Sequence, residues 1–382
     1  MSSYVWSFPW QRATIQAKST PYYSFIEELC MDDFLFRGDL ADLDPDVAAL
    51  IDLEAVRQAR RLILIPSEAS VPAAVRQALG SAFHNIYAEG YPSDDWRTLE
   101  QPDILDIGLR LAEYRRYSDA RYYKGTEFAD IVESLARRRA AELFATDTIS
   151  AEQLWVNVQP LSGAPANNAV YSALLQPGDT IMGLDLLHGG HLTHGSPVNR
   201  SGLTYHVVSY SVDPDTDRLN YDTIYRQALE ARPKIIVAGF TSYPFAPDWE
   251  KFRAIADEVG AVLLADISHV SGLVIAGVFP SPVGYAQIIS FTTHKTLAGP
   301  RGAVLMTTDS RLGRKLDRAV FPGEQGGPHV NAMAAMAVAF RLAGTDQFRE
   351  LQRQTVLNAQ RLAERLAARG LRIPHGGTES HL

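Results

Sequence analysis

The stretch KIIVAGFTSYPFAPDWEKFRAIADEVGAVLLADISH, residues 234–269, contains a strand, a helix and a second strand in succession. Its segments 234–240 and 261–266 are largely apolar, and the first is rich in β-branched residues, whereas WEKFRAIADEV between them repeats apolar residues at helical spacing. Gly260 stands where such a helix ends. Strands that are apolar without alternation are typical of a parallel sheet covered by helices on both faces. The stretch therefore predicts an α/β fold.

The same alternation of strands and helices continues on both sides of this stretch. Further strands are predicted at 154–159, 180–186, 288–293 and 303–308, and further helices at ANNAVYSALL and YDTIYRQALEA. After Pro328 the pattern becomes helical, until LRIPHGGTESHL at the end of the sequence predicts the start of another strand.

Three parts of the chain are expected to differ in organisation. Residues 1–62 form an N-terminal arm followed by an amphipathic helix over 45–61, residues 63–335 form the large α/β domain, and residues 336–382 begin a C-terminal domain that is mostly absent from the sequence. The segment 93–120 reads as an insertion into the large domain, and we expect a solvated surface helix with a polar lead-in there.

Composition excludes several classes of function. The 382 residues carry a net charge of -8, and an acidic chain repels phosphate backbones, so nucleic acid is not expected as a partner. The single cysteine, Cys30, cannot form an intrachain disulfide and is expected to be a small apolar residue. The sequence has no apolar run of membrane-spanning length. These features favour a cytoplasmic protein without a membrane partner.

Candidate chemical residues follow the predicted strands, at the sheet edge where α/β proteins bind ligands. Asp266 and His269 follow one strand, and Lys295 follows the next. Ser162 and Gly163 lead into a helix N-terminus, whose free N–H groups favour a phosphate. Alone, each of these is most simply a helix cap or a solvated charge. Together they make up the set that pyridoxal phosphate requires: a Schiff-base lysine, an acid for the ring nitrogen and a phosphate anchor.

A histidine-rich loop, HGGHLTHG, follows the strand at 180–186. Its His188, His191 and His194 are spaced in a way that is not typical of zinc ligands, so no metal site is expected.

Six motifs in this order resemble the serine hydroxymethyltransferase family: LIPSE (64–68), NIYAEGYP (85–92), RYYKGTEFAD (121–130), LLHGGHLTHGSPVNRSG (186–202), TTHKTLAGPRG (292–302) and VFPGEQGGP (320–328). The resemblance covers roughly residues 45 to 382 apart from the insertion. It implies a fold type I pyridoxal-phosphate enzyme, with a mostly parallel seven-stranded sheet and helices on both faces. The implied reaction interconverts serine and glycine and passes the one-carbon unit to tetrahydrofolate.

The resemblance also implies a role for each matching residue around the cofactor. Lys295 would form the Schiff base, Asp266 would pair with the pyridine nitrogen, and His191 would stack on the ring. His269 would lie close to the ring, Thr241 would lie near the ring oxygen, and Thr292 would assist the lysine. Ser162 and Gly163 would hold the phosphate.

Further roles are implied around the substrate and a second subunit. Tyr87, with Gly326 and Gly327, would reach the phosphate of a neighbouring subunit's cofactor, which implies a homodimer or larger assembly. Ser67 and Tyr123 would contact the amino-acid carboxylate. Glu89 would move the proton on the substrate hydroxyl or on the folate side.

The sequence departs from the family pattern at several positions. Ser162-Gly163-Ala164-Pro165 stands where the family has Ser-Gly-Ser-Gln, and the lost hydroxyl at Ala164 is expected to weaken cofactor binding by about 1.5–3 kcal/mol. Ala69 replaces a common Asn, and Lys124 replaces a usual Gly near the substrate end. The arginine that pairs with the substrate carboxylate in the family would lie beyond Leu382, so we expect a fragment of a longer gene product or a short protein with impaired activity.

Two other functions stay open on the sequence alone. The first is an aldolase that splits β-hydroxy amino acids without folate, which the substitutions Ala69 and Lys124 and the insertion would suit. The second is a non-catalytic partner or scaffold subunit, which the missing domain and Ala164 would suit. The preferred substrate, the folate dependence and the size of the oligomer are not determined by the sequence.

Overall fold

The computed structural model describes residues 34–382, so most of the expected arm and Cys30 lie outside the described residues. The chain separates into two compact units, Met1–Leu64 and Ile65–Leu382. In the first, the short helices α2 (Phe34–Arg37) and α3 (Leu40–Leu43) precede α4 (Pro45–Arg60), which confirms the helix expected over 45–61. Asp44 caps α4 by accepting a hydrogen bond from Val47 N, and none of the helix's residues is buried.

One seven-stranded sheet organises the second unit, with the strand order β1-β7-β6-β5-β4-β2-β3. Its strands are β1 (Trp155–Asn157), β2 (Thr180–Leu184), β3 (His206–Tyr210), β4 (Ile235–Gly239), β5 (Val262–Asp266), β6 (Ile288–Thr292) and β7 (Ala303–Thr307). The neighbouring strands β3, β2, β4, β5 and β6 pair in parallel, whereas β7 runs antiparallel to both β6 and β1. The mostly parallel seven-stranded α/β sheet is therefore confirmed.

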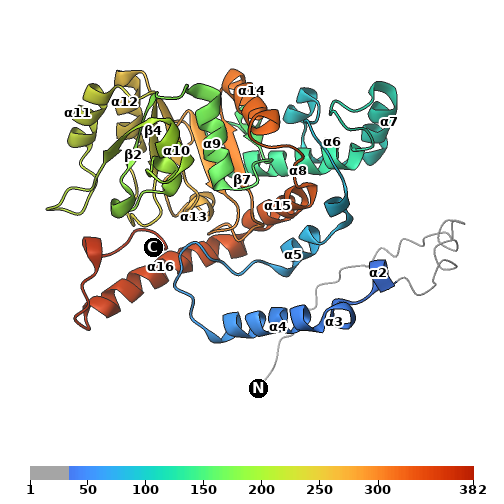
Figure 1. Cartoon of the computed structure of the whole chain (residues 1–382), viewed down its shortest axis with the longest axis horizontal. Helices are drawn as coiled ribbons and strands as arrows, with labels where there is room; N and C mark the ends of the chain where they lie inside the picture. Colours follow the sequence, from blue (N-terminus) through green and yellow to red (C-terminus); the bar gives the residue numbers. More distant parts are fainter. Residues whose placement is uncertain (1–33) are drawn as a thin grey trace, which may run out of the picture. The chain divides into compact units, whose positions relative to one another are not determined.

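Helices connect and cover these strands in the second unit. The longer ones are α7 (Ile107–Tyr117), α8 (Glu127–Phe144), α9 (Gly163–Leu174), α11 (Tyr221–Ala231), α12 (Trp249–Val259), α14 (Ser310–Arg318), α15 (Val330–Ala343) and α16 (Asp346–Ala367). The shorter ones are α5 (Ala73–Leu79), α6 (Gln101–Ile104), α10 (Arg200–Thr204) and α13 (Ser271–Ile275). Figure 1 shows α11 and α12 beside β2 and β4, and α9 beside β7. Gly260 ends α12 with a φ of +70°, as its position in the sequence indicates.

Alternate residues of each strand enter two separate apolar cores, one on each face of the sheet. In β4, Ile236 and Ala238 pack into the core that α8, α12 and α15 cover. Ile235 and Val237 pack into the opposite core, which α9 and α14 cover. Because both faces of the strand are buried, the strand is apolar throughout, and this is why its sequence shows no alternation.

The observed strands differ from the predicted ones in two places. The strand β3 was not expected, because HVVSY at the sheet edge pairs only with β2 and leaves His206 and Ser209 exposed, which weakens its apolar pattern. Conversely, the strand expected from residue 371 onward is absent from the described residues. A 3₁₀ turn, Pro374–Gly376, lies there instead, and Gly376 and Gly377 adopt the positive φ values of 73° and 156°.

The segment 93–120 is helical as expected, with a 3₁₀ turn at Asp94–Thr98 followed by α6 and α7. Most of its residues are exposed, as expected for a solvated surface helix, but three side chains turn inward. Ile104, Arg110 and Asp119 are buried, with exposed fractions of 0%, 5% and 7%. Among residues 34–382, no helix combines the length and the apolar character needed to cross a membrane.

Candidate active site

A cavity lies at the carboxyl ends of β4, β5 and β6, the edge at which open α/β sheets bind ligands. Its lining includes the following residues singled out in the sequence: Ser162, Gly163, His191, Thr241, Asp266, His269, Thr292 and Lys295. These residues are spread over more than a hundred positions of the sequence, so the parallel sheet is what brings them to one place.

Asp266 ends β5 with its carboxylate buried among hydrogen-bond donors. Its Oδ2 accepts from Asn167 Nδ2 at 2.8 Å and lies 3.1 Å from His194 Nε2. Its Oδ1 accepts from Ser268 Oγ at 2.5 Å. Burial alone would raise the pKa of Asp266, but the hydrogen bond and charge of His194, with His191 and Ser268, lower that pKa below its ordinary value. The carboxylate therefore stays ionised at neutral pH.

Lys295 lies in the tight loop between β6 and β7. A Cβ at Gly299 would lie 2.7 Å from Thr293 O, so only glycine allows the loop to fold back beside the strand end. The lysine is 9% exposed. Burial lowers its pKa below the ordinary value, and the negative charge of Asp266 opposes this shift. A lysine with a lowered pKa has a larger fraction of the neutral, nucleophilic amine at a given pH.

Two histidines line the cavity in their neutral form. Burial lowers the pKa of His191 to about 4 and the pKa of His269 to about 2. The Nδ1 of His191 accepts from Thr193 N at 3.2 Å, which leaves the proton of the neutral ring on Nε2. The buried Nδ1 of His269 has no hydrogen-bond partner among the described residues. A buried polar atom without a partner favours a ligand or water nearby.

The N-terminus of α9 offers an anion site at the cavity wall. Ser162 is the N-cap residue but its side chain caps no backbone N–H, so its hydroxyl is available to a ligand. Gly163 and Ala164 also line the cavity, at the positive end of the helix dipole. Pro165, the next residue of the first turn, has no N–H, so the anchor has one donor fewer than most helix N-termini.

The two threonines of the expected set already use their hydroxyls within the protein. Thr241 Oγ1 donates to Gly190 O at 2.7 Å, which fixes the threonine against the histidine-rich loop. Thr292 Oγ1 donates to Ser268 O at 3.4 Å, and Thr292 N donates to Ser268 Oγ at 3.2 Å. Their contribution at the cavity is thus to hold loops in position.

The remaining expected residues do not line this cavity, and most of them gather in a second cluster. The rings of Tyr87 and Tyr123 are stacked with their centroids 5.4 Å apart. A Cβ at Gly327 would lie 3.1 Å from the Tyr87 ring, and one at Gly326 would lie 3.4 Å from Glu89 Oε1. The cluster therefore joins the segment around Glu89 to the glycine pair that follows α14.

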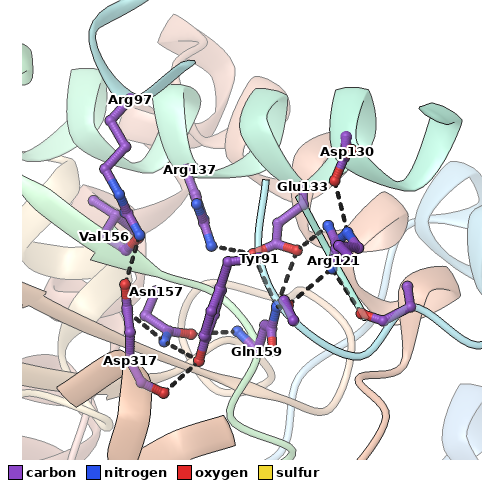
Figure 2. Close-up of polar contacts among 12 residues, drawn as sticks. Tyr91, Arg97, Arg121, Asp130, Glu133, Arg137, Val156, Asn157, Gln159 and Asp317 are labelled. Carbon is purple, nitrogen blue, oxygen red and sulfur yellow. Dashed lines mark hydrogen bonds and ion pairs between the residues drawn. The ribbon is translucent and has the colours of Figure 1, made fainter. Parts of the chain in front are cut away.

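The segment that carries Glu89 is held by a buried arginine (Figure 2). Arg121 Nη1 donates to Ala88 O at 2.7 Å and to Gly90 O at 3.0 Å, the carbonyls on either side of Glu89. The same guanidinium pairs with Asp130 and Glu133 of α8, each at 2.6 Å. Because these contacts are buried, they fix the backbone at Glu89 and leave its side chain free to act.

Two glutamines link this cluster to the loop that precedes α9. Gln159 Nε2 donates to Gly90 O at 2.9 Å, and Gln325 Nε2 donates to Gln159 O at 2.7 Å. Gln325 Oε1 in turn accepts from Leu161 N at 3.2 Å, directly before Ser162. Gln325 therefore fixes the loop before α9 and the glycine pair relative to each other.

Ser67 lies apart from both groups, but its neighbour in the chain is connected to the cavity. Pro66 O lies 3.1 Å from His381 Nε2. The His381 ring stacks on the ring of His269, with centroids 5.6 Å apart and an interplanar angle of 29°. Ser67 thus follows a residue that is tied to a wall of the cavity.

Four residues of the site were missed by sequence reasoning: Asn167, His194, Ser268 and His381. His194 was noted only as part of its loop, although it bonds to Asp266. Asn167 lies one helical turn after Gly163 and so on the same side of α9, which is a usable signal. Ser268 follows Asp266 closely enough to suggest a local hydrogen bond. His381 gives no local signal, because its contacts are far away in the sequence.

With this geometry in view, comparison with known proteins identifies the family. The family model described as serine hydroxymethyltransferase matches residues 40–115 and 103–382. The chain belongs to the serine hydroxymethyltransferase family. The expected family and fold type are thereby confirmed.

Curated relatives named serine hydroxymethyltransferase agree with this. The protein of Clavibacter sepedonicus is 47% identical over 355 residues, which is 92% of this chain and 76% of the relative. That of Kocuria rhizophila is 48% identical over 357 residues, with the same two shares of 92% and 76%. That of Prochlorococcus marinus is 48% identical over 343 residues, 90% of this chain and 73% of the relative.

The family model matches the chain in two ranges, 40–115 and 103–382, and these ranges overlap at residues 103–115, inside the segment 93–120. The substituted Lys124 next to this segment points its ammonium group at backbone carbonyls, donating to Asp119 O and, at 3.3 Å, to Arg121 O. It therefore secures the end of the segment.

An arginine anchors the other end of the segment to the sheet (Figure 2). Arg97 pairs with Asp317 at 2.6 Å and donates to Val156 O at 3.1 Å. Its guanidinium lies over the Trp155 ring, 3.7 Å from the centroid. Asp317 also accepts from Asn157 Nδ2 at 2.7 Å. The segment is thus attached to the core at both ends.

The residues present fit the pyridoxal phosphate that a serine hydroxymethyltransferase uses. The cavity has an ionised buried carboxylate at Asp266 for a protonated ring nitrogen and a lysine of lowered pKa at Lys295. It also has an uncapped helix N-terminus at Ser162 and Gly163 for a phosphate, and an unpartnered donor or acceptor at His269 Nδ1.

Proposed function

We propose that this chain catalyses the pyridoxal-phosphate-dependent interconversion of serine and glycine, with transfer of the one-carbon unit to tetrahydrofolate. The observation that carries the proposal is that Lys295, Asp266 and the N-terminus of α9 line one cavity. Membership of the serine hydroxymethyltransferase family supports the same reaction.

Pyridoxal phosphate, when bound, supplies an electron sink for the α-carbon of the amino acid. Lys295 would hold its carbonyl carbon, and Ser162 and Gly163 would bind its phosphate. His191 and His269 would lie against its ring as neutral groups, since burial keeps the pKa of each low.

Asp266 would hold a proton on the ring nitrogen. Its own low pKa supports this role, because an ionised carboxylate beside the nitrogen stabilises the protonated pyridinium. Asn167, His194 and Ser268 keep the carboxylate in one orientation. These three are positioning residues, and Thr241 and Thr292 position the adjoining loops in the same way.

Glu89 would move the proton of the substrate hydroxyl, and Ser67 and Tyr123 would contact the substrate carboxylate. The rigid backbone around Glu89, held by Arg121, supports a role for its side chain in proton transfer.

We further propose that the active enzyme is a homodimer or a larger assembly. Tyr87, Gly326 and Gly327 gather in one cluster but do not line the Lys295 cavity of their own chain, so they would serve a neighbouring subunit's cofactor. A cytoplasmic location is also proposed, on the basis of the single cysteine in the sequence.

Glycine formation from serine tests the proposed function. The purified chain, loaded with pyridoxal phosphate, is assayed with and without tetrahydrofolate, alongside Lys295→Ala. We expect glycine to form only with both tetrahydrofolate and Lys295. Cleavage of a β-hydroxy amino acid without folate, in the absence of the serine reaction, would favour the aldolase instead. A folded, cofactor-loaded chain inactive in both assays would contradict catalysis by this chain.

A further inference from the structure

A second cavity, of about 540 Å³, lies between the segment 93–120 and the start of α8. It shares no lining residue with the Lys295 cavity, so it is not part of the site described above. Its volume falls in the range of roughly 300–1,000 Å³ that small-molecule sites occupy. None of its lining residues is proposed to touch the cofactor or the substrate, although Asp130 also pairs with Arg121.

Five carboxylates line this cavity: Asp95, Glu113, Asp119, Glu127 and Asp130. Among its lining residues, Arg110 is the only lysine or arginine. Arg110 pairs with Glu113 at 2.8 Å, and Asp130 pairs with Arg121 at 2.6 Å. Glu127 keeps a buried Oε2 without a hydrogen-bond partner among the described residues. The excess of negative charge favours a cation, and Glu127 offers an acceptor for it.

Arg110 provides a second, independent indication of a ligand. Its side chain is 5% exposed, yet its Nε makes no hydrogen bond within the described part of the chain. A buried guanidinium N–H without an acceptor is costly, so a ligand that accepts a hydrogen bond here gains affinity. The guanidinium is held in place by Glu113 and by the Trp96 ring, whose centroid is 5.0 Å away.

Aromatic rings supply the apolar part of the lining. Trp96, Tyr114 and Tyr117 all contribute to the cavity. The hydroxyl of Tyr114 accepts from Gly125 N at 2.5 Å, which fixes that ring, whereas Tyr117 is 71% exposed and lies at the rim. Aromatic faces attract organic cations as well as apolar groups.

We propose that this cavity binds a small organic amine that also carries a hydrogen-bond acceptor. The protonated nitrogen binds Glu127, the apolar part packs against the rings of Trp96 and Tyr117, and the acceptor takes the hydrogen bond of Arg110 Nε. The ligand site shares no residue with the cavity around Lys295 and lies between the segment 93–120 and the start of α8.

Titration calorimetry with N,N-dimethyltyramine tests the proposal on the full chain loaded with pyridoxal phosphate. This tertiary amine has a cation, an aromatic ring and a hydroxyl, and it cannot form a Schiff base with the cofactor. The matched control ligand is its uncharged isostere, in which a CH group replaces the nitrogen. We expect one-site binding of the amine, and binding of the isostere weaker by about tenfold or more.

Variants locate the site. Glu127→Gln removes the charge of the carboxylate whose Oε2 has no partner, and it is expected to weaken binding of the amine by about tenfold. Glu250→Gln, at an exposed position of α12, should leave the affinity unchanged. Tyr117→Ala alters an exposed rim residue and so keeps the fold, and it is expected to weaken binding severalfold. No binding of the amine, equal binding of the isostere, or affinity unchanged by both Glu127→Gln and Tyr117→Ala would overturn the proposal.

Discussion

The salt bridge between Arg97 and Asp317 is predicted to be a main attachment of the segment 93–120. The side chains of Arg97 and Asp317 are 11% and 9% exposed, and the Nη2–Oδ2 distance is 2.6 Å. Arg97→Met keeps a long apolar side chain beside Trp155, but it removes the guanidinium that lies over the Trp155 ring and leaves Asp317 without this cationic partner. Leaving one charge of a buried pair alone typically costs about 3–5 kcal/mol, so we expect the free energy of unfolding to fall by about 3 kcal/mol.

The pKa of Asp317 gives this prediction a pH dependence. Burial raises the pKa of Asp317, and the charges of Arg97 and Arg137 lower it, so the loss of Arg97 raises it further. When the pKa of a carboxyl group is higher in the folded protein than its unfolded value of 3.8, the free energy of unfolding falls as the pH rises above 3.8. The penalty of Arg97→Met should therefore shrink as the pH falls and Asp317 becomes protonated.

Urea unfolding followed by circular dichroism measures the penalty, at equal cofactor concentration for all variants. Asp317→Asn and the double variant complete a cycle, in which we expect a coupling of about 2 kcal/mol. Asp94→Asn is the matched control, because the Asp94 side chain that also pairs with Arg97 is 53% exposed and should contribute at most about 1 kcal/mol. A penalty for Arg97→Met no larger than that of Asp94→Asn would refute the reasoning.

Three further predictions concern the candidate active site. Gly163→Val places a Cβ 2.8 Å from Thr292 Cγ2, so either the start of α9 or Thr292 at the cavity must shift, and the affinity for pyridoxal phosphate should fall about tenfold in a spectroscopic titration. Gly108→Ala on α7 should leave that affinity unchanged. Asp266→Asn should still bind the cofactor but lose about a hundredfold or more in glycine formation, and full activity would argue against its role at the ring nitrogen. His269 has a folded pKa of about 2, below its unfolded 6.5, so its contribution to stability is complete above pH 6.5 and is lost as the pH falls. Between pH 6.5 and 4, the unfolding free energy of the cofactor-free wild type should therefore drop more steeply than that of His269→Gln, by about 1 kcal/mol per pH unit; equal slopes would contradict this.

The fold was predictable where local patterns coincide with tertiary structure. The strand–helix–strand stretch from residue 234 to 269 is apolar where both faces are buried, and Gly260 ends its helix. The edge strand β3 was not predictable in the same way, because two of its five residues, His206 and Ser209, are exposed. A short turn at Pro374–Gly376 looked like a strand, since an apolar start alone does not reveal whether a partner strand exists.

The candidate site was predictable as a set of strand-end residues but not as a network. Lys295 and Asp266 follow apolar strands, and parallel strands bring such positions to one edge of the sheet. The partners that orient Asp266 come from distant segments, as with Asn167, which is 99 residues away in the sequence. Arg97 and Asp317 are 220 residues apart, so no local pattern announces their pairing.

The most direct test of the central claim asks where the cofactor is attached. The chain is loaded with pyridoxal phosphate, reduced with borohydride to fix any Schiff base, digested and mapped by mass spectrometry. We predict a single major adduct on Lys295 in the wild type, and no adduct at that site in Lys295→Ala. An adduct mainly on another lysine, or none in a folded wild-type chain, would contradict the assignment of Lys295 and with it the proposed reaction.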